Sequence, residues 1–262
     1  GGLSVSTDGG ATFTNRTTSN GLGNTMVFGV YAVGSTVYAA TAGGVGVSTD
    51  GGATFTNYTM SNGLGSNFVS GVYAVGSTVY AATYGGLGVS TDGGATFTNY
   101  TTSNGLGNDL VYGVFTVGTT VYAATGGGGL STGTQPAPVY TFTNRTTSNG
   151  LGNNGVFGVY TVGSTVYAAT FGGLGISTDG GATFTNRTTS NGLGANNVNA
   201  VYSVGSTVYA GTFNGGLSIS TDGGATFTNR TTINSGLANN NVRWVYTAGS
   251  TVYAATFGGL GS

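Results

Sequence analysis

Short runs of valine, tyrosine and threonine alternate with glycine-rich turns along the whole chain. Runs of this composition, bounded by glycine, aspartate or serine, are typical of β-strands. In one unit, Gly34-Ser35 and Asp50-Gly51-Gly52 separate such runs as tight hairpin turns do. No window shows the apolar spacing of an amphipathic helix. We therefore predict four antiparallel strands, A to D, over residues 27–33, 36–41, 45–48 and 54–59.

The same unit recurs six times along the chain. Each copy contains the hexapeptide Thr-Val-Tyr-Ala-Ala-Thr, or Thr-Val-Tyr-Ala-Gly-Thr in one copy, and the tyrosines of successive copies are 42 to 45 residues apart. A period of this length, with units too small to bury their own apolar faces, is typical of propellers and repeat arrays. We predict an all-β fold, a six-bladed β-propeller of four-stranded blades. The tyrosines are Tyr38, Tyr80, Tyr122, Tyr167, Tyr209 and Tyr253.

The phase of the repeat predicts how the ring closes. Residues 1–18 carry strands C and D, whereas residues 239–262 carry strands A and B. We expect these two segments to form one composite blade within a single domain of 262 residues. The other blades are expected at about residues 19–60, 61–102, 103–147, 148–189 and 190–238.

A short segment at the end of the sequence is surplus to this scheme. Residues 258–262 repeat the start of strand C and duplicate residues 1–4. We expect a tail here. The alternative is that the segment adds as a strand to a neighbouring molecule, in which case the ring does not close within one chain.

The turn between strands C and D resembles a known repeat. The sequence Ser6-Thr7-Asp8-Gly9-Gly10-Ala11-Thr12-Phe13 resembles the Asp-box, or BNR, repeat of a β-propeller family that includes sialidases, sortilin-type receptors and bacterial lectins. Flanking segments are similar to ligand-sensing periplasmic propeller repeats. The resemblance implies a propeller and no single activity. Its aspartates are Asp8, Asp50, Asp92, Asp179 and Asp222.

The residue types of this turn favour a structural role. An aspartate at a hairpin accepts backbone N–H groups across its own turn, while glycine supplies the positive φ. We expect no metal and no cofactor at these sites. One repeat departs from the pattern: residues 126–138 replace the turn with a longer, glycine-rich loop that holds both prolines of the chain.

Charge is scarce, which excludes several functions. The chain has six Asp, five Arg and no Lys, Glu, His or Cys, so charged residues are 4% of the total. Nucleic-acid binding needs clustered cations, which five scattered arginines do not provide. No run approaches the apolar length of a membrane helix. A surface with so little charge tends to associate, and we expect an extracellular or cell-surface protein whose targeting signal lies outside this sequence.

Catalysis is not expected from these residues. Serine and cysteine hydrolases need a histidine or cysteine, and a sialidase needs a glutamate; the chain has none of these. Five of the six aspartates are assigned to separate turns, which leaves Asp109 as the one carboxylate free for other work. We predict that the protein is not an enzyme.

Residues that differ between the repeats indicate where binding would occur. They fall just before strand A, within strand A and just after strand B, which share one face of a propeller blade. Aromatic side chains on a polar rim suit sugar rings or a protein partner; the alternative is that they line the channel or fill gaps between blades. The candidates are Arg243, Trp244, Tyr84, Phe171, Phe213, Phe28, Tyr112, Phe157 and Asp109.

Asn-x-Thr sequons recur in strand D, where attached sugar would solvate a surface that lacks charge. Their asparagines are Asn15, Asn57, Asn99, Asn144, Asn186 and Asn229.

Two hypotheses follow. In the first, the chain is a structural protein whose surface packs into a filament or coat of identical copies. In the second, it is a monomeric, lectin-like module that binds glycans or a protein. The low charge and the surplus strand favour the first, and the repeat-specific aromatics favour the second.

Overall fold

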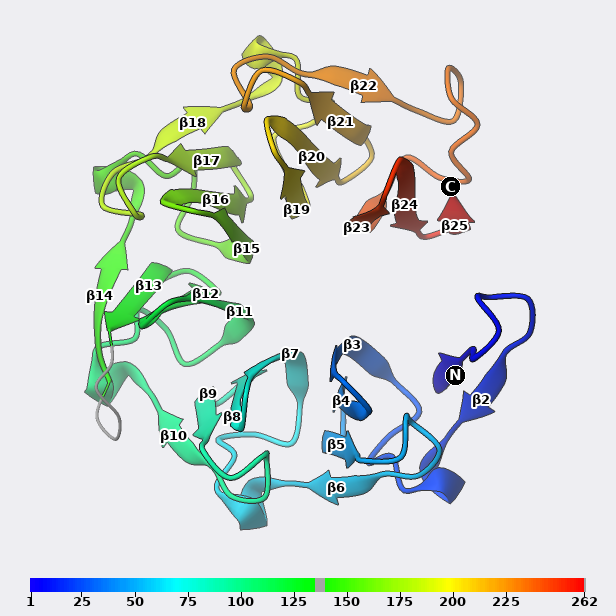
Figure 1. The fold of residues 1–262 in the computed structure, drawn as a ribbon. Helices are drawn as coiled ribbons and strands as arrows, with labels where there is room; N and C mark the ends of the chain where they lie inside the picture. The colour runs from blue at the N-terminus through cyan, green and yellow to red at the C-terminus, as the bar shows by residue number, and fades with distance from the viewer. Residues whose placement is uncertain (135–139, 262) are drawn as a thin grey trace. The chain divides into compact units, whose positions relative to one another are not determined.

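The computed structural model describes residues 1–134 and 140–261, and it consists almost entirely of antiparallel β-sheet (Figure 1). Its backbone divides into two compact units, residues 1–114 and 115–262. Part of the predicted proline loop, residues 135–139, lies outside the described residues. Over the described part, five sheets have four strands, one has three and one has two.

The four-stranded sheets follow the predicted order A, B, C, D. They are β3 to β6 (Val27–Val33, Thr36–Thr41, Gly44–Ser48, Thr56–Tyr58), β7 to β10 (Val69–Val75, Thr78–Thr83, Gly86–Ser90, Thr98–Tyr100), β11 to β14 (Val111–Val117, Thr120–Thr125, Gly129–Thr134, Thr141–Arg145), β15 to β18 (Val156–Val162, Thr165–Thr170, Gly173–Ser177, Thr185–Arg187) and β19 to β22 (Val198–Val204, Thr207–Thr212, Gly216–Ser220, Thr228–Arg230).

The two smaller sheets contain the first and last strands. β1 (Leu3–Val5) pairs with β2 (Thr14–Arg16) in the register of strands C and D. β23 (Val242–Ala248) and β24 (Thr251–Thr256) are strands A and B, and β25 (Gly259–Gly261) adds to the edge of β24 as strand C does elsewhere. The surplus segment is therefore a strand in its own sheet over residues 259–261. In the predicted composite blade β1 would pair with the edge of β24 that β25 occupies here. The composite blade therefore stays a prediction.

Five of the six loops from strand D toward the next strand A contain a single 3₁₀ turn that the apolar pattern did not predict; the loop between β22 and β23 has none. A threonine caps the turn, an asparagine three residues later bonds back to it, and a glycine in the left-handed region ends it, as in Thr17, Asn20 and Gly21. Three residues are too few to create a helical period. The turns are η1 to η5 (Thr18–Asn20, Met60–Asn62, Thr102–Asn104, Thr147–Asn149, Thr189–Asn191).

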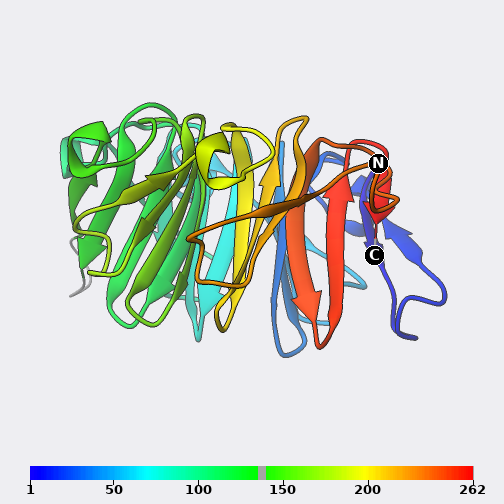
Figure 2. The same cartoon turned by 90° about the horizontal axis from the view of Figure 1, so that it is seen from above.

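The strands of a sheet run between two ends of different character (Figure 2). At one end the A–B hairpin meets the aspartate turn, where Gly51 N donates to Ser35 O at 3.0 Å. At the other end the residue after strand B bonds the residue before strand A, as Tyr84 N does to Phe68 O at 3.2 Å. The residues just before strand A and just after strand B therefore lie at the same end of a blade.

Within each unit, consecutive sheets pack face to face. We call the face turned to the next sheet in sequence the forward face, and the other the backward face. On the forward face of β3 to β6, Tyr38, Ala40 and Val45 are buried against the next sheet's backward face, which contributes Val69 and Val79. The phenylalanine of the next aspartate turn completes such contacts, and the four copies at Phe55, Phe97, Phe184 and Phe227 are each only 8% exposed.

A glycine in the first strand allows the sheets to approach closely. A Cβ atom on Gly29 would lie 3.7 Å from Gly71 Cα in the next sheet, and one on Gly71 would lie 3.4 Å from Tyr112 O. Ala200 occupies the equivalent position in β19, and Trp244 occupies it in β23. Trp244 is 66% exposed, and within the second unit no described sheet covers the forward face of β23.

This spacing makes the position a test of sheet packing. We expect Gly71→Ala to change the free energy of unfolding by less than about 1 kcal/mol, since alanine occurs naturally in β19. Gly71→Trp should cost about 3 kcal/mol, because a large ring there overpacks a filled contact. Trp244→Gly, on the uncovered face, is the matched control and should leave the urea midpoint of the monomer nearly unchanged. A tolerated Gly71→Trp would contradict the packing described.

Candidate functional site

The aspartate turns are closed hydrogen-bonding units. In one of them Asp50 accepts from Ser48 Oγ at 2.6 Å, from Thr54 Oγ1 at 2.6 Å and from the backbone N–H of Ala53 at 2.9 Å. The serine hydroxyl first, and then the threonine, hold the pKa of the Asp50 carboxyl far below its ordinary value. The other four turns repeat the serine and threonine bonds, which lower the pKa of Asp8, Asp92, Asp179 and Asp222; at Asp8 the threonine has the larger effect.

The sixth carboxylate is also engaged. Asp109 Oδ1 accepts from the backbone N–H of Thr102 at 2.7 Å and so bridges the loop between strand D and the next strand A. The asparagines Asn67 and Asn154 make the same bond in other repeats, at 2.8 and 2.9 Å. Because an uncharged amide serves equally well, the position of Asp109 is explained by loop structure.

A β-bulge explains the variable position within strand A. The register of β3 against β4 shifts between Val27 and Gly29, which leaves Phe28 unpaired. A bulge residue is aimed differently from its neighbours. In β7 the bulge residue Ser70 donates to Val111 O of the next sheet at 2.7 Å. Bulge side chains therefore reach across to the following sheet.

In the first unit these positions assemble a continuous aromatic row. The ring of Phe28 lies 4.6 Å from that of Phe68, and Phe68 lies 4.1 Å from Tyr84. Tyr84 contacts Tyr112 edge-on at 6.3 Å. Phe28 and Tyr84 are 43% and 47% exposed. The row thus combines three of the predicted residues with Phe68, which stands among the residues that vary between repeats.

In the second unit the aromatic candidates form separate groups. Phe157 and Phe171 pack together at 4.2 Å, and Phe213 is exposed in the next sheet. The guanidinium of Arg243 lies 4.5 Å from the centre of the Phe257 ring, a cation–π contact. The predicted Arg243–Trp244 pair is divided by the bulge: Arg243 is the bulge residue, and Trp244 pairs with Ala255 on the sheet.

Three of the sequon asparagines, Asn57, Asn99 and Asn186, hold strand D to the turn between strands B and C. Asn57 Nδ2 donates to Gly43 O at 2.8 Å, and its buried Oδ1 has no partner among the described residues. In two other sheets a serine replaces the glycine of strand C and donates to the Oδ1 of the sequon asparagine, as Ser218 Oγ does to Asn229 Oδ1 at 2.6 Å. Glycosylation at Asn57 would replace one of the two hydrogens on the Nδ2 that donates to Gly43 O.

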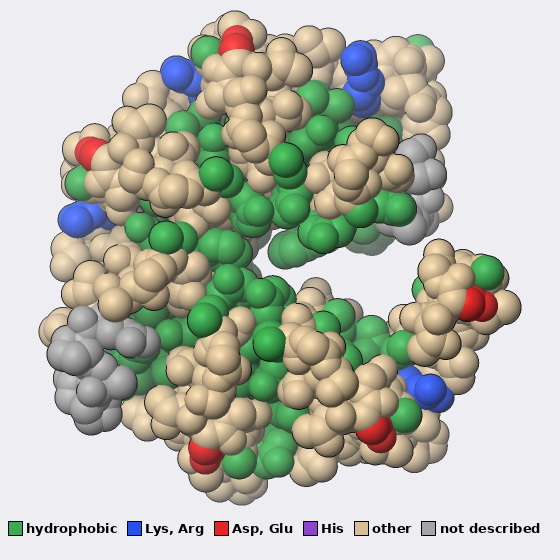
Figure 3. Space-filling model, in the orientation of Figure 1, with side chains coloured by type: hydrophobic (Ala, Val, Ile, Leu, Met, Phe, Trp, Pro, Cys, Tyr) green, Lys and Arg blue, Asp and Glu red, His purple; other side chains and the backbone are tan. Residues whose placement is uncertain are grey.

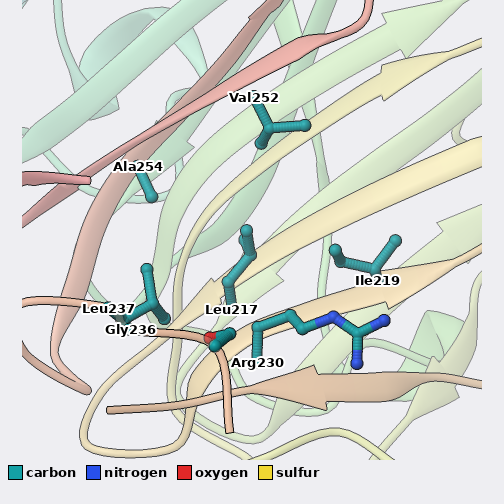
Figure 4. A pocket seen from close by; sticks show the side chains of 8 residues that line it. Leu217, Ile219, Arg230, Gly236, Leu237, Val252 and Ala254 are labelled. Carbon is teal, nitrogen blue, oxygen red and sulfur yellow. The ribbon is translucent and has the colours of Figure 1, made fainter. Parts of the chain in front are cut away.

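A pocket that the sequence did not indicate lies in the second unit, between β21–β22 and β24 (Figure 4). Leu217 and Ile219 line one side, and Val252 and Ala254 line the other. The exposed Arg230 side chain lies at its rim, and no partner for its guanidinium is present in the described part of the chain. Ser235, Gly236 and Leu237 of the following loop complete the lining, so the pocket is mainly apolar with one cation and one hydroxyl.

Charged side chains are scattered singly over the surface in Figure 3. Among the described residues no three His, Cys, Asp or Glu side chains are grouped so that they could hold a metal ion. No helix in the described part of the chain is long and apolar enough to cross a membrane.

The sheets, their strand order and their turns define a β-propeller. The extracellular domain of the hybrid two-component system BT3049 from B. thetaiotaomicron is similar, with a TM-score of 0.72 and 19% identity over 94% of this chain and 34% of that one. YCF48 from Cyanidioschyzon merolae has a TM-score of 0.67 and 17% identity, over 97% of this chain and 85% of YCF48. An ancestral GH74 enzyme has a TM-score of 0.70 and 18% identity, over 91% of this chain and 36% of the enzyme.

These likenesses show the fold alone, which is the predicted all-β, six-bladed β-propeller. The chain spans about a third of the BT3049 domain. No protein-family model and no curated protein matches the sequence.

The lowered pKa values of the five turn carboxylates predict how stability depends on pH. A carboxyl whose pKa is depressed by folding stabilises the native state above the unfolded pKa of about 4, and this stabilisation is lost as the pH falls. The urea midpoint should be flat from about pH 7 to pH 5 and fall from about pH 4 to pH 2. Asp92→Asn should reduce the slope, whereas Asp109→Asn, which removes a carboxylate outside the aspartate turns, is the control. A midpoint that stays flat down to about pH 2 would contradict the prediction.

Proposed function

We propose that this chain is a non-enzymatic, extracellular structural module of the Asp-box type that joins copies of itself head to tail. Several similar structures are extracellular domains, although two others are GH74 enzymes. The bonds within the aspartate turns occupy carboxylates that catalysis would need. The observation that carries the proposal is a pair of incomplete blades whose side chains are exposed where complete blades bury them.

The β1–β2 hairpin is the first incomplete blade. Its turn residue Phe13 is 65% exposed, whereas Phe55, Phe97 and Phe227 at the same place are 8% exposed. The β23–β25 sheet is the second. Its Tyr253 is 37% exposed, whereas the tyrosines at that place in four other sheets are 3–5% exposed.

Each incomplete blade has what the other lacks. β1–β2 supplies strands C and D, and β23–β24 supplies strands A and B. Fully burying a phenylalanine side chain stabilises a contact by about 1.5–3 kcal/mol, so pairing the two halves is favourable. Pairing between copies is heterologous, and such contacts generate closed rings of subunits or open filaments. The low charge of the chain opposes this association only weakly.

Electron microscopy across a concentration series, with the mass followed by light scattering, tests the proposal. We expect ordered assemblies whose mass rises with concentration and is nearly insensitive to salt, because the contact is apolar. Discrete particles with the 25.7 kDa mass of one chain at every concentration would contradict it.

The aromatic row of the first unit favours a second function, recognition of a glycan or a protein segment. Exposed rings beside uncharged polar loops suit the apolar faces of sugars. YCF48, one of the similar proteins, has been solved with a peptide bound.

Two variants would separate recognition from assembly. Tyr84→Ala removes an exposed ring from the row, and we expect it to weaken binding on a glycan or peptide array about tenfold or more. Phe171→Ala, outside the row, is the matched control. Equal binding by wild type and Tyr84→Ala would exclude the row as the binding site.

A further inference from the structure

The pocket beside Arg230 has the composition of a blade contact from which one ring is missing. In the preceding contact, Leu174 and Ile176 face Val208 and Ala210 of the next sheet, and Phe227 is buried with them. Leu217, Ile219, Val252 and Ala254 hold the same strand positions around the pocket. The described residues place no aspartate-turn phenylalanine among them.

The repeat identifies the missing ring. In each complete contact the phenylalanine comes from the aspartate turn of the sheet that provides the backward face. Here that sheet has β23 and β24 as strands A and B, and its β25 is followed by no aspartate turn among the described residues. The one aspartate turn that belongs to an incomplete blade is that of β1–β2, with the exposed Phe13.

Arg230 gives an independent indication of the same occupant. Three arginines at the end of strand D donate from Nε to a glycine carbonyl in the next aspartate turn: Arg16 to Gly52 at 2.9 Å, Arg145 to Gly181 at 3.1 Å and Arg187 to Gly224 at 2.9 Å. Each acceptor is the second glycine after the aspartate.

Arg230 occupies this position in β22, beside the pocket, without such an acceptor in the described structure. In the β1–β2 turn the equivalent acceptor is the carbonyl of Gly10. The guanidinium of Arg230 therefore matches the carbonyl of Gly10, and the apolar floor of the pocket matches the ring of Phe13. These two partners are three residues apart in one hairpin.

We infer that the Arg230 pocket is the docking site for the β1–β2 hairpin of a second copy of this chain. The inference rests on the proposed self-association and names its contact. Phe13 of the incoming hairpin fills the pocket, and Arg230 Nε donates to Gly10 O. The occupant is assigned to a second copy because self-association is the proposed function and the low charge of the chain opposes it only weakly.

The strand β25 must leave for the docked hairpin to pair fully. It holds the edge of β24 through three residue pairs, Thr256 with Gly259, Ala255 with Leu260 and Ala254 with Gly261. Residues 1–3, which lead into β1, have the same Gly-Gly-Leu sequence as residues 258–260, which lead into β25. Unlike β25, β1 is already paired with a strand D, β2. β25 thus acts as an exchangeable cap on the edge, and a chain lacking residues 258–262 should associate faster than the full chain.

Two variants with complementary defects provide the test. Phe13→Asp damages the hairpin and keeps the pocket, whereas Arg230→Glu damages the pocket and keeps the hairpin. Both side chains are exposed, so each variant should fold with an unchanged urea midpoint. Alone, each should associate at least about a hundredfold more weakly than wild type. Mixed in equal amounts, they should form dimers that do not grow, because only one junction is intact.

The control is Ile233→Asp, which places the same charge on a residue that is 93% exposed and outside the site. It should assemble as wild type does. If Phe13→Asp assembles equally well, the docking site is wrong while self-association stands. If wild type is monomeric at every concentration and Phe13→Asp lowers its urea midpoint, the hairpin fills the pocket of its own chain, and both the site and the proposed function are overturned.

Discussion

The packing of one sheet's forward face on the backward face of the next is the contact on which this protein depends. A single blade has strands of only three to seven residues and cannot enclose an apolar core. Alanines such as Ala40 and glycines such as Gly29 bring neighbouring strands close, and the aspartate-turn phenylalanine completes the contact. A blade face without a neighbour therefore stays apolar and exposed, and β1–β2 and β23–β25 each have such a face within their own unit.

The few charged groups serve this packing. Five aspartates tie their own turns and so position the phenylalanines that follow them. Three arginines connect strand D to the next aspartate turn, and a fourth, Arg230, lies at the rim of an unfilled contact. Because the ionic groups are used in turns and between blades, the surface is left to threonine, serine, asparagine and aromatic side chains. Such a surface suits contacts with copies of the chain or with uncharged ligands.

The sequence predicted the strands well because glycine turns bound them and each unit repeats. The predicted strands at residues 27–33 and 36–41 coincide with β3 and β4, whereas the predicted strand D at 54–59 is shorter, Thr56–Tyr58, because Thr54 is bonded to Asp50. The candidate site was predicted less completely. The bulge that separates Arg243 from Trp244 depends on pairing with β24, and the Arg230 pocket depends on a missing neighbour; neither has a signature in local sequence.

The structure of the assembled protein at a junction between copies, determined by electron cryomicroscopy, tests the proposed contact most directly. We expect the Phe13 ring of one copy to lie between Leu217 and Val252 of the next, with β1 in place of β25 on the edge of β24. A junction made by other surfaces, or a pocket filled by the hairpin of the same chain, would contradict it.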